Sequence, residues 1–253
     1  MRGVLLFLTT CILVLPSAAS GQRAPISNLN LERARAHYTA AWEHMQSEKF
    51  DRAAAEFQLA TDFDPKFAMA WYGLGRAHMA LKLYRQAVQN LVVCRDLFSA
   101  ETSRQYNAQA DANRARQDRL LELQDMRSSY LKGPATNQSR DMVRLIENQI
   151  RMTTDAFNRD VTVSIEEHVP AFVSLALGSA YFRTEQFDKA ERAYKDAIRA
   201  DDSVGAAHNN LAVLYLMRER VDAADSELKA AEKAGLFVDP DLKEAVRVKR
   251  ATK

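Results

Sequence analysis

The order of apolar and polar residues along the chain predicts the same amphipathic helix twice. Residues 49–65 (KFDRAAAEFQLATDFDP) and residues 186–202 (QFDKAERAYKDAIRADD) both place apolar side chains at helical spacing. This pattern is typical of a helix with one buried face. The two segments align on Phe50 and Phe187. Further copies are therefore expected in the same register.

Two further copies of this helix start at Tyr84 and Val221, each 34 residues after the copy before it. An apolar segment precedes every copy, so the repeated unit is a pair of helices. One such pair cannot bury its apolar face alone, and neighbouring pairs must stack. The small residue Gly178 lets the two helices of a pair approach closely, while Tyr194 fills the space that it leaves.

The 34-residue period and its framework residues resemble the tetratricopeptide repeat. Four units are expected, at residues 34–67, 68–101, 171–204 and 205–238. The framework residues that match best lie in the second and third units: Trp71, Leu74, Gly75, His78, Leu177, Gly178, Tyr181, Ala190 and Tyr194. The resemblance implies an all-α fold, a helical solenoid of two pairs of helix-turn-helix repeats, and the sequence between the pairs predicts a long helical hairpin that interrupts it.

The interruption covers residues 102–170. Its first part has no Gly or Pro where a repeat would bend, so we expect one continuous helix from about residue 102 to residue 131. After the break KGPATN, apolar residues recur at spacings of 3 and 4 from Val143 to Phe157, which predicts a second helix and a hairpin like an antiparallel coiled coil. The hairpin either projects as an arm or continues the stack as a spacer. The alternating residues 161–169 indicate an extended tether.

The first 20 residues have the order of a secretory signal peptide: Arg2, an apolar run over residues 4–15, then small residues. We therefore expect an exported protein, periplasmic or secreted, with no integral membrane span after cleavage. The expected organisation is as follows: signal peptide 1–20, linker or helix 21–33, repeat units 34–101, hairpin and tether 102–170, repeat units 171–238, and capping helix 239–253.

Composition and motifs argue against several kinds of chemistry. The chain has 35 Lys and Arg against 33 Asp and Glu, which gives no electrostatic case for nucleic acid. Cys94 alone remains after residue 20, at a position where the repeat needs a small residue, so a buried thiol is expected. Four of the five histidines fall at framework positions: His37, His44, His78 and His208. Only His168 does not. We expect no enzyme, no metal and no cofactor.

In the resembled family, the first helix of each unit lines a concave groove that binds partners. By register, the groove residues of this chain are Arg35, Tyr38, Trp42, Met45, Tyr72, Arg76, Met79, Phe172, Leu175, Phe182, Asn209, Val213 and Leu216. This surface is aromatic and rich in Met, which suits an apolar peptide or an amphipathic helix. Trp42, Tyr72 and Phe182 are expected to be accessible anchors. The alternative is that the chain's own helix covers the groove, from residues 22–33 or from the hairpin.

Two functions remain open at this point. The first is a non-catalytic protein-protein interaction scaffold in cell-envelope assembly, with a protein or peptide partner in the groove. The alternative is a self-associating structural subunit, a homodimer through the hairpin at residues 102–158. The sequence does not identify the partner.

Overall fold

The computed structural model describes residues 28–102, 109–158 and 169–252, and in these residues every regular element is a helix. The predicted all-α fold is confirmed. The eleven helices of this part of the chain are α1 Asn28–Gln46, α2 Phe50–Phe63, α3 Ala68–Ala80, α4 Tyr84–Thr102, α5 Gln109–Lys132, α6 Asn137–Asn158, α7 Ala171–Arg183, α8 Phe187–Ala200, α9 Gly205–Met217, α10 Val221–Lys233 and α11 Pro240–Ala251.

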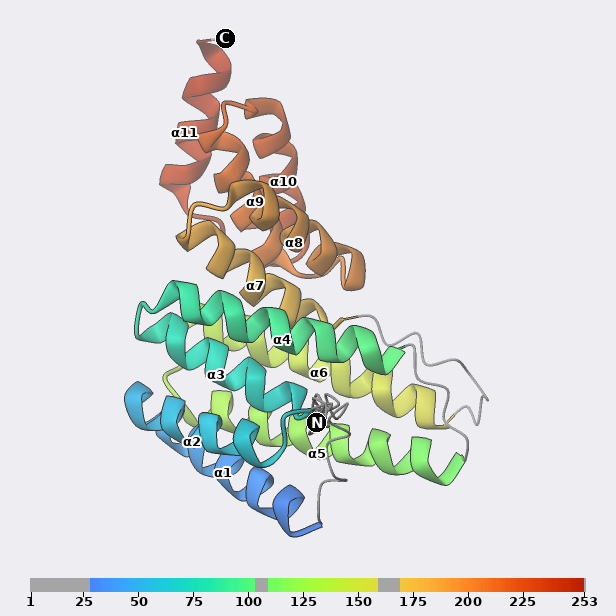
Figure 1. Cartoon of the computed structure of the whole chain (residues 1–253). Helices are drawn as coiled ribbons and strands as arrows, with labels where there is room; N and C mark the ends of the chain where they lie inside the picture. Colours follow the sequence, from blue (N-terminus) through green and yellow to red (C-terminus); the bar gives the residue numbers. More distant parts are fainter. Residues whose placement is uncertain (1–27, 103–108, 159–168, 253) are drawn as a thin grey trace, which may run out of the picture.

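Four pairs of helices form the predicted repeat units and stack in chain order (Figure 1). The pairs are α1 with α2, α3 with α4, α7 with α8, and α9 with α10. Helix α4 packs directly on α7, although the hairpin separates them in sequence. The stack is therefore continuous from the second unit to the third, and the prediction that the hairpin continues the stack as a spacer is wrong.

Small residues bring the two helices of a unit together, as the repeat pattern predicts. A Cβ atom added at Gly178 would lie 2.6 Å from Cδ1 of Tyr194, and one at Gly75 would lie 2.6 Å from Cγ of Leu91. Cys94 is fully buried in the second helix of its unit. Ala60, Ala197 and Ala231, its counterparts in the other units, are equally buried. These contacts form the core that runs along the stack.

The turn inside each unit has the same backbone geometry in all four units. Glu48, Lys82, Glu185 and Glu219 occupy equivalent positions, and each has a positive φ between 53° and 61°. The next residue donates its backbone N–H to a carbonyl five residues earlier, at 2.8–2.9 Å in every unit. Non-glycine residues adopt this left-handed conformation rarely. Its recurrence shows that the tight turn is a property of the repeat and independent of the local side chain.

The hairpin folds back onto the stack. Helices α5 and α6 pack on each other, α5 packs on α1, and α6 packs on α7. Since α1 and α7 are first helices of their units, the hairpin lies on the face that the first helices α1, α3, α7 and α9 line, here called the concave face. The prediction of a projecting arm is therefore also wrong, and the hairpin covers only the N-terminal half of the groove. Figure 1 shows the hairpin, in green and yellow, alongside the first two units.

Both ends of the predicted organisation extend beyond the repeats. Helix α1 begins at Asn28, before the first unit, and α11 begins at Pro240, as expected for a capping helix. The Asp239 side chain accepts a hydrogen bond from the Asp241 N–H and so caps α11. Residues 1–20 and 161–168 lie outside the described residues. Within the described ranges, no helix has the length and apolar character needed to cross a membrane.

Candidate functional site

The concave face is divided into a covered half and an open half. In the N-terminal half, Tyr38 and Trp42 of α1 are 1% and 3% exposed, because rings of their own unit pack against them and α5 packs on α1. In the C-terminal half, the first helices α7 and α9 line an open cavity. The same repeat register therefore produces two different surfaces.

Aromatic contacts dominate the covered half. The Trp42 ring lies 5.4 Å from the Phe57 ring and 5.8 Å from the ring of Tyr130 on α5. Such ring pairs stabilise a core beyond the area that they bury. Hydrogen bonds also join α5 to α1. The Ser129 hydroxyl donates to the Trp42 carbonyl at 3.3 Å, and the Tyr38 hydroxyl donates to the backbone carbonyl of Glu122 at 3.3 Å.

Arg76 lies at the boundary between the two halves. Its Nη1 donates to the Tyr72 hydroxyl at 3.2 Å, and its guanidinium lies 5.7 Å from the centre of the Tyr130 ring. Burial alone would lower the pKa of Arg76, but Tyr130 and Tyr72 outweigh it and raise this pKa. Burial also raises the pKa of the Tyr72 hydroxyl. The guanidinium of Arg76 therefore stays positively charged at the edge of the cavity, in contact with the Tyr72 and Tyr130 side chains.

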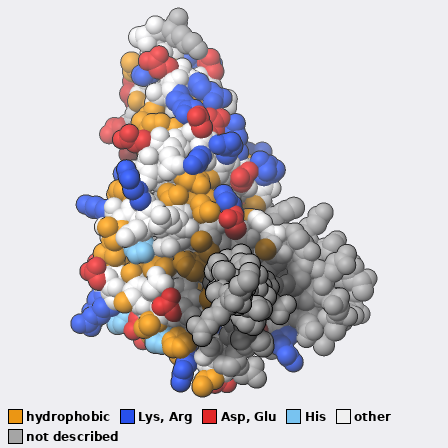
Figure 2. Space-filling view, viewed as in Figure 1, with side chains coloured by type: hydrophobic (Ala, Val, Ile, Leu, Met, Phe, Trp, Pro, Cys, Tyr) orange, Lys and Arg blue, Asp and Glu red, His pale blue; other side chains and the backbone are white. Residues whose placement is uncertain are grey.

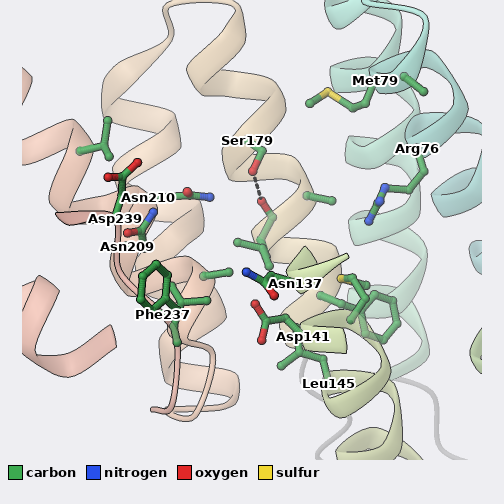
Figure 3. A pocket seen from close by; sticks show the side chains of 18 of the residues that line it. Arg76, Met79, Asn137, Asp141, Leu145, Ser179, Asn209, Asn210, Phe237 and Asp239 are labelled. Atoms are coloured by element: carbon green, nitrogen blue, oxygen red, sulfur yellow. Dashed lines mark hydrogen bonds between the residues drawn. The ribbon is translucent and has the colours of Figure 1, made fainter. Parts of the chain in front are cut away.

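The open half is a cavity of about 870 Å³ between α3, α6, α7, α9, α11 and the connection from α10 to α11, and it reaches Met45 of α1 and Phe50 of α2. Figure 3 shows Arg76 and Met79 on one side, Phe237 and Asp239 on the opposite side, and Asp141 and Leu145 of α6 below them. Most side chains that line the cavity are apolar. They are Met45, Phe50, Met79, Ala80, Met142, Leu145, Phe172, Leu175, Ala176, Ala206, Val213, Leu236, Phe237 and Leu242.

The charged groups of the cavity are few and partly engaged. Burial raises the pKa of the Asp141 carboxyl, although Arg144 lies 3.8 Å away and opposes the shift. Asp239 caps α11 through the Asp241 N–H. The polar residues Asn137, Ser179, Asn209 and Asn210 complete the lining. The cavity is therefore an apolar trough with polar groups along its length, a composition that suits a peptide segment.

The predicted groove residues divide among three environments. Seven line the open cavity: Met45, Arg76, Met79, Phe172, Leu175, Asn209 and Val213. Tyr38, Trp42 and Tyr72 are buried, the first two under α5 and Tyr72 with its ring 5.0 Å from that of Phe172. The remaining three lie outside the cavity lining: Arg35 pairs with Asp118, Phe182 packs on Phe187, and Leu216 packs against the core.

The expectation that Trp42 and Tyr72 are accessible anchors is wrong for this conformation. Trp42 packs on Phe57 of its own two-helix unit as well as on Tyr130 of α5, so the prediction that it points out of that unit's core is wrong. Tyr72 packs on Phe172 of α7. Phe182 is partly buried, with its ring 5.7 Å from the Phe187 ring. A role of these residues in partner binding stays a prediction.

Sequence reasoning did not include the walls that the hairpin and the last connection supply. Asn137, Asp141, Met142 and Leu145 come from α6, and Leu236, Phe237, Asp239 and Leu242 from the C-terminal connection and α11. Phe237 is 76% exposed, the highest exposure among the large apolar side chains of the described residues. The three apolar residues after Gly235, in a charged stretch of sequence, were the signal available for this wall.

The histidines of the repeats make structural pairs. His37 Nδ1 lies 2.7 Å from Glu56 Oε2, and the equivalent atoms of His208 and Glu227 in the fourth unit lie 2.6 Å apart. Each pair joins the two helices of one unit. Over the residues that the structure describes, no three His, Cys, Asp or Glu side chains are grouped as a metal site would require. His168 lies outside those residues.

Comparison with known families agrees with this geometry. A sequence profile described as "Tetratricopeptide repeat" matches residues 30–90 and 175–235, on both sides of the hairpin. The chain is a tetratricopeptide-repeat protein. Proteins of this class expose extended concave surfaces that bind other proteins. The hairpin α5–α6 lies outside both matched ranges.

Several solved structures of tetratricopeptide-repeat proteins are similar to this chain. A thermophilic TPR protein in Thermus thermophilus has 21% identity and a TM-score of 0.36, over 86% of this chain and 99% of that chain. YrrB, a TPR protein with an unusual peptide-binding site, has 16% identity and a TM-score of 0.29, over 87% and 93%. PilW, a widely conserved type IV pilus biogenesis factor, has 15% identity and a TM-score of 0.38, over 87% and 91%. A search of curated proteins finds no match.

Proposed function

We propose that this tetratricopeptide-repeat protein is a non-catalytic scaffold that holds an apolar peptide or helix of a partner protein in the open half of its concave face. The protein is exported and works in the assembly of the cell envelope. The hairpin contributes to binding, because α6 forms one wall of the cavity. The sequence of residues 1–20 supports the export step.

The observation that carries this proposal is the cavity itself. Its volume of about 870 Å³ and its apolar lining suit the side chains of a peptide segment more than a solvated surface. Phe237 stands at its rim with 76% of its surface exposed. Apolar side chains also gather around the middle of the face seen in Figure 2, below the charged side chains of the C-terminal helices. Exposed apolar surface of this kind marks interaction sites.

Photocrosslinking from position 237 tests the binding site. A photoreactive residue replaces Phe237, and the full chain is irradiated in envelope extracts, with and without Val213→Asp in the cavity. We expect one crosslinked partner that disappears with Val213→Asp, since a carboxylate in an apolar site is strongly unfavourable. Leu59→Asp is the matched control, because Leu59 is 40% exposed on α2 and outside the cavity. A crosslink that survives Val213→Asp in a folded chain would exclude the cavity as the site.

Export has a separate test. N-terminal sequencing of the protein recovered from the envelope fraction should give a chain that starts near residue 21. An intact Met1 in that fraction would contradict a cleaved signal peptide. The result does not depend on the crosslinking experiment, so export and binding are tested independently.

The self-associating subunit is not favoured. The seam residues Leu123, Met126 and Ile146 are all 0% exposed within one chain, so they are not available to a second chain. Sedimentation at micromolar concentration decides between the two functions. If the protein is a scaffold, we expect a monomer. A dimer that dissociates when residues of the hairpin are substituted would favour the alternative.

A further inference from the structure

We infer that the N-terminal half of the concave face is a second helix-binding site, which α5 fills in this conformation and which a partner helix with the same side-chain pattern takes by displacing α5. The inference rests on the proposed scaffold function, since it concerns the same concave face. It goes further in naming the occupant, an amphipathic helix with an apolar row like Leu123, Met126 and Tyr130.

The stack does not need the hairpin for its continuity. Helix α4 packs on α7, so the second and third units are already neighbours without α5 or α6 between them. The profile of the repeat matches residues on both sides of the hairpin and not the hairpin itself. The hairpin is therefore an addition laid on a complete solenoid, in the position that a bound ligand would take.

One face of helix α5 has the side-chain spacing of a helix bound in a groove, and Tyr130 on this face contacts Trp42 of α1. Leu123, Met126 and Tyr130 are spaced i, i+3 and i+7, the spacing with which an amphipathic helix anchors in a groove. Leu123 and Met126 are fully buried, and the Tyr130 ring lies 5.8 Å from the Trp42 ring. The rim carries an ion pair, in which Arg35 Nη2 lies 2.6 Å from Asp118 Oδ1. Apolar centre and charged rim are the usual anatomy of a protein interface.

The contact between hairpin and stack is less complete than the core of the repeats. Two buried polar atoms of α5 have no hydrogen-bond partner within the described residues: Arg116 Nε and Tyr130 Oη. Arg116 is only 8% exposed. Burying polar groups without partners costs free energy, which lowers the net gain from seating α5. Contacts between parts of one chain that resemble transient interfaces permit relative motion. The contact of α5 therefore has the properties of an exchangeable one.

The chemistry of the site defines the partner. The surface under α5 consists of Tyr38 and Trp42 with the Phe57 ring behind them, and these three rings carry no formal charge. A competing helix must bring large apolar or aromatic side chains on one face and polar residues on the other. Once α5 has left, this surface adjoins the open cavity through Arg76 and Met45, so one long partner helix reaches both halves.

The experiment uses α5 itself as the probe. A fluorescent peptide with the sequence of residues 109–132 is titrated against the full chain and against the Met126→Asp variant, with fluorescence anisotropy as the measurement. The variant loosens its own α5, because a carboxylate replaces a fully buried methionine. We expect the peptide to bind the variant at least about tenfold more tightly than the parent, because the free site is more populated. A peptide with Asp at positions 123 and 126 should not bind.

Hydrogen exchange makes each outcome decisive. Peptide binding to Met126→Asp, together with faster exchange in α5 alone, supports the inference. Exchange in α5 that accelerates without peptide binding overturns it. If Met126→Asp unfolds the chain, Met126→Ala replaces it, since the smaller side chain removes apolar contacts of α5 without burying a charge. If α5 leaves the stack in both variants only when the whole chain unfolds, the hairpin is part of the core and the inference is wrong.

This outcome is separable from that of the proposed function. Val213→Asp lies in the open cavity and should leave peptide affinity unchanged. If the partner crosslink is absent but the peptide still binds, only the proposed site in the open half is contradicted. Intact crosslinking without peptide binding would affect only the second helix-binding site in the covered half.

Discussion

The two halves of the concave face share one framework and differ in what covers it. Trp42 in the N-terminal half is 3% exposed under α5, whereas Phe237 beside the C-terminal half is 76% exposed. Turn geometry, small-residue contacts and helix pairing are the same in both halves. The repeat register therefore determines which residues point to the concave face, and a segment outside the repeats determines which of them meet solvent.

The two halves also differ in how their neighbouring helices are joined. Aromatic rings from Tyr38, Trp42 and Tyr130 connect α1 to α5. In the third and fourth units, Glu191 of α8 forms a polar cluster. Its Oε1 accepts hydrogen bonds from Lys195 at 2.8 Å and from the Tyr215 hydroxyl and Arg220, each at 3.2 Å. The contact of α1 with α5 thus includes a cluster of aromatic rings, and the contact of α8 with α9 includes a partly buried carboxylate hydrogen-bonded to Tyr215.

Trp42→Ala should have the largest effect on this comparison. The substitution removes a buried ring that contacts Tyr38, Phe57 and Tyr130. We expect the free energy of unfolding to fall by ~3–5 kcal/mol. Chemical denaturation with circular dichroism measures the change.

Phe237→Ala is the matched control for Trp42→Ala. Because Phe237 is 76% exposed, its truncation should change the free energy of unfolding by less than ~0.5 kcal/mol. Equal losses from the two variants would mean that Phe237 is covered in solution, and the distinction between covered and open halves would fail.

Gly178→Leu tests the framework that the halves share. A Cβ at this position already lies 2.6 Å from Tyr194 Cδ1, so a larger side chain must displace that ring. The expected loss is ~1–3 kcal/mol, with broader unfolding because each unit depends on its neighbours. Gly133→Ala is the control, since its Cβ would approach no atom closer than 3.5 Å. A melting temperature of Gly178→Leu within a degree of the parent would refute the assigned register.

Residues with a repeated spacing were the part of the fold that could be predicted. Gly75, Gly178 and Ala190 mark helix contacts whose partners are set by the period, so four units followed from the pattern. The left-handed turn residues could not be predicted, because Glu48 and Lys82 are not residues that favour a positive φ. The turn is imposed by the packing of both helices.

The placement of the hairpin could not be predicted for a different reason. Leu123 and Met126 show an apolar face, but the pattern is the same whether that face meets α6, a second chain or the groove. Seven cavity residues followed from register alone, whereas Met142, Leu145 and Phe237 depend on where α6 and the last connection come to rest. Periodicity identifies a buried face and carries no information about its distant partner.

Glu191→Gln should have a smaller effect than Trp42→Ala or Gly178→Leu and the clearest pH dependence. Burial alone would raise the pKa of Glu191, but the hydrogen bonds from Lys195 and Arg220 outweigh it and lower this pKa below its ordinary value of 4.5. A carboxylate with a lowered folded-state pKa stabilises the fold above the unfolded value, and this contribution is lost as pH falls through the folded value. We expect the free energy of unfolding of the parent to exceed that of the variant by ~1 kcal/mol at pH 7. This difference should vanish in acid, below the folded-state pKa. Asp118→Asn in the covered half is the comparison variant for Glu191→Gln. The ion pair of Asp118 with Arg35 is 38–51% exposed, so the loss of this pair should lower the free energy of unfolding by less than ~0.5 kcal/mol. Urea titrations of both variants from pH 3 to pH 7 measure the differences, and a pH-independent loss in Glu191→Gln would show that Glu191 acts through packing and not through its charge.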